Sequence, residues 1–162
     1  MTELVTDLTE TLSADALVLD SDLAAMACLP EWVEAVAARH GLSEKARFAA
    51  NLCLEEAVSN SIRHGYRGVR GSQVRVFFTG LTPHGWGFTV EDDAPRFNPL
   101  EKDPLPAISL ETLVIGGQGI RLMKAFATSF TYEQTPTGNR LHFAFAQTDD
   151  AAGDQTDTPP AA

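Results

Sequence analysis

The stretch LEEAVSNSIRHGY, residues 54–66, sets Glu56, Asn60 and His64 four residues apart. Side chains at this spacing lie one above the other along a helix, so the three are expected on one side of it. An amide oxygen is a hard ligand for magnesium, and a carboxylate one turn earlier can accept a proton from an attacking hydroxyl. A solvated polar helix face has the same spacing, so this stretch alone leaves both interpretations open.

The helix that carries these residues is expected over residues 43–66, because Ser43 is a favoured N-cap type and an apolar arc follows it. An Ala-rich helix precedes it. That helix begins near Asp22 with a break at Pro30, or begins at Pro30, and it ends at Gly41.

Strands are expected in adjacent pairs along the chain. Their ranges are residues 3–12, 74–78, 86–91, 130–135 and 139–145, with a third helix over residues 120–130. The segment 80–85 has the length of a hairpin loop, and four prolines exclude a regular element across residues 92–106. Paired strands favour a largely antiparallel sheet, so the fold class is α+β.

A second chemical motif is EDDAPRFNP, residues 91–99, in which a strand runs into two acids and a proline turn. A carboxylate at a strand end, such as that of Asp92, can accept a hydrogen bond from an exocyclic amine like that of adenine. A turn that simply favours Asp and Pro is the alternative.

A third motif is GGQGIRLM, residues 116–123, in which a glycine-rich turn opens a helix. Unpaired backbone N–H groups at such a turn face an anion, and the helix dipole assists. The motif is neither a GxxxxGKS phosphate loop nor a dinucleotide fingerprint after a strand. A flexible loop before a core helix is the alternative.

The length of 162 residues predicts one domain, and the formal charge is −10. An acidic chain is a poor general binder of nucleic acid or anionic membrane, so neither is expected as a partner. Residues 1–38 hold eight acids and no base, which indicates a docking surface or an ordinary solvated face. The acidic stretch 148–162 has no aromatic or branched aliphatic residue and is expected to be a disordered tail.

Two cysteines, Cys28 and Cys53, do not make a disulfide framework or a metal cluster. They are expected to be reduced, buried thiols in a cytoplasmic protein. The sequence has no apolar run long enough to cross a membrane and no secretory signal.

In their order and spacing, the three motifs together resemble the GHKL, or Bergerat-fold, ATP-binding superfamily. Residues 54–66 look like its N box, residues 91–99 its first glycine box, and residues 116–126 (GGQGIRLMKAF) its second. Within the superfamily the chain is most similar to the small anti-sigma-factor serine/threonine kinases. Their N box commonly reads Glu, three residues, Asn, then a His-Gly/Ala-Tyr ending, as it does here.

The resemblance implies a two-layer α/β sandwich with helices on one face of the sheet. It implies an ATP-binding domain of histidine kinase-like type over residues 1–147, ahead of the tail at 148–162. It also implies ATP and magnesium as cofactors, an alternative sigma factor and its anti-sigma antagonist as protein partners, and possible assembly as a homodimer.

The resemblance also implies a role for each matching residue. Glu56 becomes the general base, with the adjacent Glu55 as a rival, and Asn60 becomes the magnesium ligand. Asp92 binds the adenine amine. In the second glycine box, the backbone approaches the phosphates at Gly117 and Gly119, and the helix that begins near Ile120 faces them.

The chain departs from the family pattern at several places, including Asn98 in the ending of the first glycine box and a short prolyl lid whose one base is Lys102. Ala94 stands where the first glycine box usually has Gly, so its methyl group is expected to crowd the adenine or to shift the turn. Val114 and Ile115 occupy the stretch where some relatives carry an Arg near the γ-phosphate. These departures bear on phosphoryl transfer more than on nucleotide binding.

Two functions follow as main expectations. The first is an ATP-dependent serine/threonine kinase that binds an alternative sigma factor and phosphorylates a serine of a small antagonist protein. The second is an ATP-gated module whose nucleotide only sets the shape of a partner surface. A detached histidine-kinase catalytic domain is a weaker alternative.

Overall fold

The computed structural model describes residues 15–101 and 125–147, and its framework in these ranges is a five-stranded antiparallel sheet. The strands are β1 (Ala16–Asp20), β2 (Gln73–Thr82), β3 (Gly85–Asp92), β4 (Ser129–Gln134) and β5 (Asn139–Ala146). Their order across the sheet is β1-β2-β3-β5-β4, which places β3 and β5 side by side at its centre.

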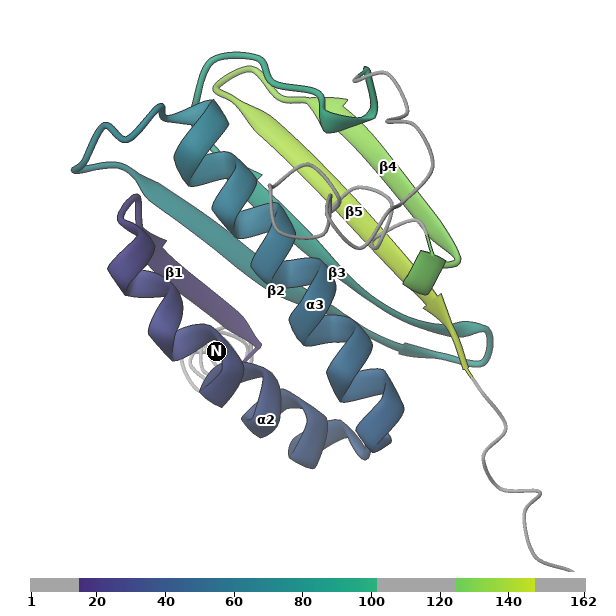
Figure 1. Cartoon of the computed structure of the whole chain (residues 1–162). Helices are drawn as coiled ribbons and strands as arrows, with labels where there is room; N and C mark the ends of the chain where they lie inside the picture. Colours follow the sequence, from purple (N-terminus) through teal and green to yellow (C-terminus); the bar gives the residue numbers. More distant parts are fainter. Residues whose placement is uncertain (1–14, 102–124, 148–162) are drawn as a thin grey trace, which may run out of the picture.

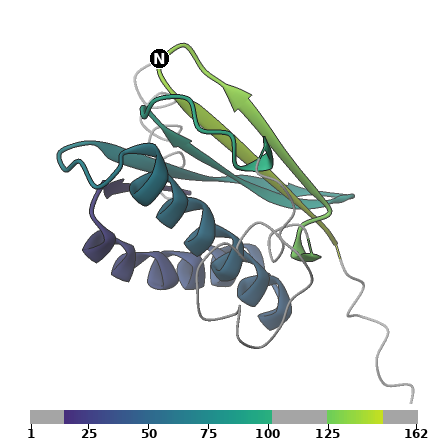
Figure 2. The same cartoon turned by 45° about the horizontal axis from the view of Figure 1, so that its top comes forward.

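Two helices, α2 (Leu29–His40) and α3 (Glu44–Asn60), lie next to each other on one face of this sheet (Figures 1 and 2). Three shorter helical segments are η1 (Leu23–Cys28), η2 (Ser61–Gly65) and η3 (Pro99–Glu101). The arrangement confirms the α+β class and the two-layer sandwich with its helices on one face. No helix in the described ranges is long and apolar enough to cross a membrane.

The helix ends follow the expected capping chemistry. The Ser43 hydroxyl accepts a hydrogen bond from the Ala46 backbone N–H at 3.1 Å and so caps α3. Gly41 ends α2 in a left-handed conformation at φ 66°. Pro30 lies in the first turn of α2, and the residues after Asp22 form the separate 3-10 helix η1. A helical segment therefore begins at each of the two positions that the sequence predicted as alternatives, one after Asp22 and one next to Pro30.

The core lies between the helices and the sheet. Its fully buried residues include Leu54, Ala57 and Val58 of α3, Val74 and Val76 of β2, Phe88 of β3 and Phe143 of β5. Burial of this apolar stripe fixes the rotation of α3 about its axis. Glu56 and Asn60 consequently lie half-buried at the side of α3, outside the apolar stripe.

The structure adds one strand that the sequence did not predict and changes the bounds of a hairpin. The added strand is β1, just before η1; the strand predicted at residues 3–12 lies outside the described residues. The central hairpin is also longer than predicted, because β2 and β3 leave only residues 83–84 between them. Gly80 does not end β2. It lies at φ 89° inside a register shift between Phe78 and Leu81, which absorbs the irregularity within the strand.

The third predicted helix, over residues 120–130, is wrong at its end. Only residues 125–126 of the described chain are helical there, and β4 begins at Ser129. Phe130 belongs to this strand and stacks on Phe143 of β5, with ring centroids 4.7 Å apart. Cross-strand aromatic packing therefore overrides the helical period of the apolar residues.

The two cysteines differ from each other. Cys53 is buried, and this burial raises the pKa of its thiol to about 12, so the expectation of a buried thiol is confirmed there. Cys28 is exposed, which corrects the expectation for that residue. It is the last residue of η1, just before the buried face of α2 begins at Leu29.

The turn between β4 and β5 lies directly against the end of β3. A Cβ atom added at Gly138 would overlap the carbonyl of Asp92 and lie 2.6 Å from the Cα atom of Asp93. Replacing Gly138 by Ala should push the end of β3 away, and we expect a loss of about 1–3 kcal/mol in the free energy of unfolding. Urea denaturation monitored by circular dichroism measures this loss.

Gly41→Ala is the matched control for that experiment. Gly41 has a left-handed φ of 66°, but nothing lies within 4 Å of an added Cβ atom. The control therefore carries only the backbone strain of about 1 kcal/mol and leaves the end of β3 in place. Unchanged near-ultraviolet and amide spectra around Asp92 in Gly138→Ala would contradict the predicted displacement.

Candidate functional site

A buried polar pair joins the end of β3 to the start of β5. Asp92 and Asn139 are directly opposite in the β3–β5 register and are only 5% and 4% exposed. The Asn139 amide donates a hydrogen bond to Asp92 Oδ1 at 2.8 Å, and the backbone N–H of Ala94 donates to the same oxygen at 3.1 Å. Within the described residues no donor reaches Oδ2, so this oxygen has acceptor capacity for a ligand.

Asn139 also holds the irregular segment that follows β3. Its Nδ2 lies 3.2 Å from the carbonyl oxygen of Ala94 and 3.1 Å from that of Pro95. Its Oδ1 accepts from the backbone N–H of Phe97 at 2.9 Å and from the Tyr132 hydroxyl at 2.6 Å. One buried side chain thus fixes the residues of the proline turn to the sheet.

Ala94 is buried against the end of η2. A Cβ atom added at Gly65 would lie 3.1 Å from the Ala94 methyl carbon and 3.7 Å from Asp92 Oδ2. The methyl group is 3% exposed and uses the space that Gly65 leaves free. Gly65 and Ala94 therefore form a close pair of small residues beside the free oxygen of Asp92, which brings the N box and the first glycine box together.

Asp93 lies on the other side of the strand end. The Arg75 guanidinium binds its carboxylate through two hydrogen bonds, at 2.9 and 3.1 Å, and holds the pKa of this carboxyl below its usual range. The Thr137 hydroxyl donates to it at 3.1 Å. The two consecutive acids thus have separate environments, one buried beside Gly65 and one exposed in an ion pair.

Behind the site, a ladder of charges crosses the open face of the sheet. Arg75, Glu91, Arg140 and Glu133 are in register on β2, β3, β5 and β4. Arg140 lies 2.7 Å from Glu91 and 3.1 Å from Glu133, and Arg75 lies 3.9 Å from Glu91. Each charge therefore has an opposite charge next to it, and the ladder supports the strand ends that carry Asp92 and Asn139.

A tyrosine links the N box to the first glycine box. The Tyr66 hydroxyl donates to the carbonyl of Gln73 at 2.7 Å and accepts from the backbone N–H of Asp93 at 2.8 Å. Burial is the largest cause of the raised pKa of Tyr66, and the nearby Asp92 and Asp93 raise it further. A neutral phenol is required because the hydroxyl donates one of these bonds.

Glu56 and Asn60 lie on α3, while His64 lies in the π-helical turn η2 and stacks on Phe97 with ring centroids 5.6 Å apart. The pKa of Glu56 is raised, first by burial and then by the negative charge of Glu55, and the positive charge of Arg63 opposes the rise. Glu55 itself is exposed. Of the two adjacent acids, Glu56 is the half-buried one, and its surroundings increase its proton affinity.

These residues fit a nucleotide and a magnesium ion in part. Asp92 Oδ2 matches an amine donor, and the two residues packed beside it, Gly65 and Ala94, are both small. Magnesium would take one protein oxygen from Asn60. No group of three or more His, Cys, Asp or Glu side chains suited to a metal occurs among the described residues. Magnesium at nucleotide sites commonly keeps waters and binds substrate phosphates, so a single protein oxygen is compatible with it. Gly117, Gly119 and Ile120 lie outside the described ranges.

Residues 19–145 match the family model of the histidine kinase-like ATPase domain. The chain belongs to this family. Membership implies that it binds ATP. The chain is also 27% identical over 111 residues to a protein of Bordetella bronchiseptica named serine/threonine-protein kinase BtrW, with 68% of this chain and 78% of the relative covered. The N box and both glycine boxes of the ATPase domain all fall inside the matched range.

Sequence reasoning gave no role to Asn139, Tyr132 or Tyr66. Asn139 was expected only as the first residue of a strand, and nothing in its neighbourhood marks it as polar and buried. The signal that identifies it is the register of β3 against β5, which sets Asn139 opposite Asp92. A prediction of strand pairing, rather than of strands, would have found it.

The Asn139→Ala variant tests whether the hydrogen bonds of Asn139, and not only strand packing, stabilise the end of the sheet that carries Asp92. The change removes the hydrogen bonds to Asp92, Phe97 and Tyr132 and leaves buried groups unpaired. We expect a loss of about 2–4 kcal/mol in the free energy of unfolding and a weaker affinity for ATP. Chemical denaturation and calorimetric titration measure the two effects.

Asn98→Ala is the control in the same loop. Asn98 Oδ1 accepts a bond from the Leu100 backbone N–H at 2.9 Å, and the Asn98 side chain also hydrogen-bonds Glu101. Both contacts are local, so their loss should cost about 1 kcal/mol and leave the position of Asp92 unchanged. Equal losses of stability and of ATP affinity in the two variants would contradict the proposal that Asn139 holds Asp92 in position.

Proposed function

We propose that the protein is an ATP- and magnesium-dependent serine/threonine kinase of the cytoplasm that acts as an anti-sigma factor. It would bind an alternative sigma factor and phosphorylate a serine on the small antagonist protein. The observation that carries the proposal is the carboxylate of Asp92, anchored through one oxygen by Asn139 and with the other oxygen beside Gly65. The printed name of the Bordetella relative supports the choice of serine/threonine kinase.

In this proposal Asp92 accepts a hydrogen bond from the adenine amine through Oδ2. The neighbouring Ala94 and Gly65 form the small-residue wall of the adenine pocket. Asn139 and the backbone N–H of Ala94 keep the carboxylate in place before the nucleotide arrives, so little ordering is left for the binding step.

Glu56 is the proposed general base and Asn60 the proposed magnesium ligand. Magnesium, when bound, neutralises charge on the phosphates, and positioning supplies most of the remaining rate enhancement. A half-buried carboxylate with a raised pKa is suited to accept a proton, and Glu56 rather than the exposed Glu55 lies one turn before Asn60. In the second glycine box, the backbone at Gly117 and Gly119 and the helix start near Ile120 would contact the phosphates.

Asp92→Ala should weaken ATP binding far more than Asp93→Ala. The first change removes the charged acceptor in a buried site, and we expect a loss of about 10- to 150-fold in affinity. Asp93 is the matched control, because its carboxylate is engaged by Arg75 on the other side of the strand end. Isothermal titration with ATP measures both affinities. A larger effect at Asp93 would place the adenine acceptor one residue later than proposed.

Glu56→Gln should lower the rate of phosphoryl transfer without a matching loss of ATP affinity. It keeps the size of the side chain and removes the base, so ATP affinity stays within a few-fold while transfer to the antagonist falls by about two or more orders of magnitude. Asn60→Ala should weaken magnesium-ATP binding and transfer together. The assay uses labelled ATP and candidate antagonist proteins. Transfer at the wild-type rate by Glu56→Gln would rule out this base.

The acid limb of the pH–rate profile gives a further readout of Glu56. The base acts deprotonated, and its raised pKa means that transfer declines already above the usual carboxyl range as the pH falls. Glu55→Gln removes a neighbouring negative charge and should move this limb to lower pH. A complete absence of transfer, with ATP still altering partner binding in wild type and Glu56→Gln alike, would favour the ATP-gated module instead.

A further inference from the structure

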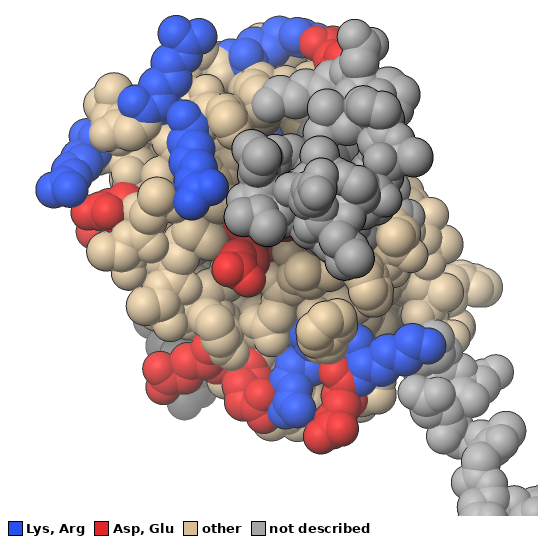
Figure 3. Space-filling model, viewed as in Figure 1, with Lys and Arg blue, Asp and Glu red and all other residues tan. Residues whose placement is uncertain are grey.

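The end of the N box and the chain directly after it carry three arginines within eight residues. Arg63, Arg67 and Arg70 are all exposed, and we call residues 63–71 the arginine loop. Figure 3 shows blue side chains gathered over this end of α3, at the upper left of the face. The whole chain has a net charge of −10, so this local excess of positive charge runs against the overall balance.

Little negative charge within the described residues offsets these arginines. Arg70 lies 3.7 Å from Asp22, yet 82% of its side chain is exposed. Arg63 and Arg67 form no ion pair with another described residue. Exposed guanidinium groups in this state keep their charge and their five donors for an external acceptor.

Hydrogen bonds hold the loop in one conformation. The Ser21 hydroxyl donates to the carbonyl of Val69 at 2.7 Å and accepts from the backbone N–H of Ser72 at 3.2 Å. The N–H of Gly68 donates to the carbonyl of Ile62 at 3.2 Å. The arginines therefore project from an ordered support, which lowers the entropy lost when a partner binds.

Arg67 occupies a backbone conformation that disfavours it. Its φ is 53°, and it is the only non-glycine residue with positive φ in the described part of the chain. Asn or Gly adopts this conformation with less strain. Backbone preference does not explain an arginine at this position. Because the residue is exposed, we infer that its side chain has a function.

An exposed apolar surface adjoins the arginines. Val69 within the loop is 62% exposed, and Leu23 of η1 is 42% exposed. The hydrogen bond between Ser21 and Val69 joins the segments that carry them. Protein interfaces combine apolar contacts with arginine and contain few lysines, and this loop contains no lysine.

We propose that the arginine loop is a docking surface for the acidic face of a partner protein, with Val69 and Leu23 as its apolar contact. Charge complementarity identifies the partner as acidic, and the exposed aliphatic side chains favour a protein over a nucleic acid. The net charge of −10 repels a long polyanion from the rest of the surface. The docking surface does not depend on phosphoryl transfer, so it stands or falls separately from the kinase activity.

The test is an amide chemical-shift titration of the isotope-labelled full chain. The probe is a synthetic peptide in which Asp and Glu alternate with Leu, compared with the same peptide carrying Asn and Gln. A short DNA duplex is the third probe. The acidic peptide should shift the resonances of residues 63–72 and bind more tightly than either of the other probes.

Arg67→Asn gives the decisive variant. Asn suits the left-handed conformation, so the melting temperature should stay the same or rise, while the affinity for the acidic peptide should fall about two- to five-fold. Adding Arg70→Gln should weaken binding further. Arg63 is left unchanged because its charge lowers the pKa of Glu56.

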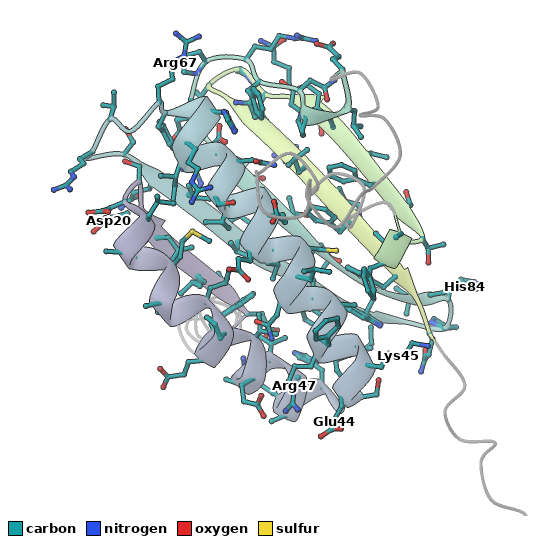
Figure 4. The ribbon with its side chains drawn as sticks, in the orientation of Figure 1. Asp20, Glu44, Lys45, Arg47, Arg67 and His84 are labelled. Atoms are coloured by element: carbon teal, nitrogen blue, oxygen red, sulfur yellow. The ribbon has the colours of Figure 1, made fainter. Side chains whose placement is uncertain are left out.

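Lys45→Asn is the matched control, with the same loss of charge at an exposed position. Figure 4 shows Lys45 at one end of α3 and Arg67 beyond the other. This variant should bind the peptide as the wild type does. The proposal is overturned by wild-type affinity in Arg67→Asn, by shifts that map elsewhere, by tighter binding of the duplex to the same loop, or by a lower melting temperature in Arg67→Asn.

Discussion

The hydrogen bond from the Asn139 amide to Asp92 organises the functional end of this molecule. It joins the two central strands, β3 and β5, at the point where β3 stops and the proline turn begins. The Asn139 side chain forms hydrogen bonds with five polar groups: Asp92 Oδ1, the carbonyls of Ala94 and Pro95, the backbone N–H of Phe97 and the Tyr132 hydroxyl. The site therefore depends on an amide that touches no ligand in the proposed chemistry.

At the same strand end, two consecutive acids, Asp92 and Asp93, lie in different environments. Alternation along β3 turns Asp92 toward the helices and Asp93 toward the open face, where Arg75 binds it. Asp93 thereby joins a ladder of alternating charges that crosses four strands. The ladder keeps charge paired on the solvent side. On the other side, the buried carboxylate of Asp92 has an amide, a backbone N–H and two small residues as its neighbours.

Sequence patterns predicted the features of this fold that depend on residues close together in the chain. The apolar stripe of α3, the cap at Ser43, the stop at Gly41 and the two hairpins all follow from such patterns. The pairing of Asp92 with Asn139 does not, because residues 47 apart meet only through strand register. The strand predicted at residues 130–135 agrees with β4 to within one residue, whereas the third helix was extended too far, to residue 130. The packing of Phe130 on Phe143 is a cross-strand contact, and the helical period of the apolar residues before it does not reveal that contact.

The end of α3 connects the buried site with the molecular surface. The helix widens into the π-turn η2, where Tyr66 N–H bonds to Ser61 across five residues, and this turn brings Gly65 against Ala94. Tyr66 then fixes the strand end through Asp93, and the next residue is Arg67 in its left-handed conformation. Two residues of chain therefore separate Gly65, which packs beside Asp92, from Arg67, which belongs to the arginine loop. The proposed adenine pocket and the proposed docking surface are thus built on the two sides of one ordered turn.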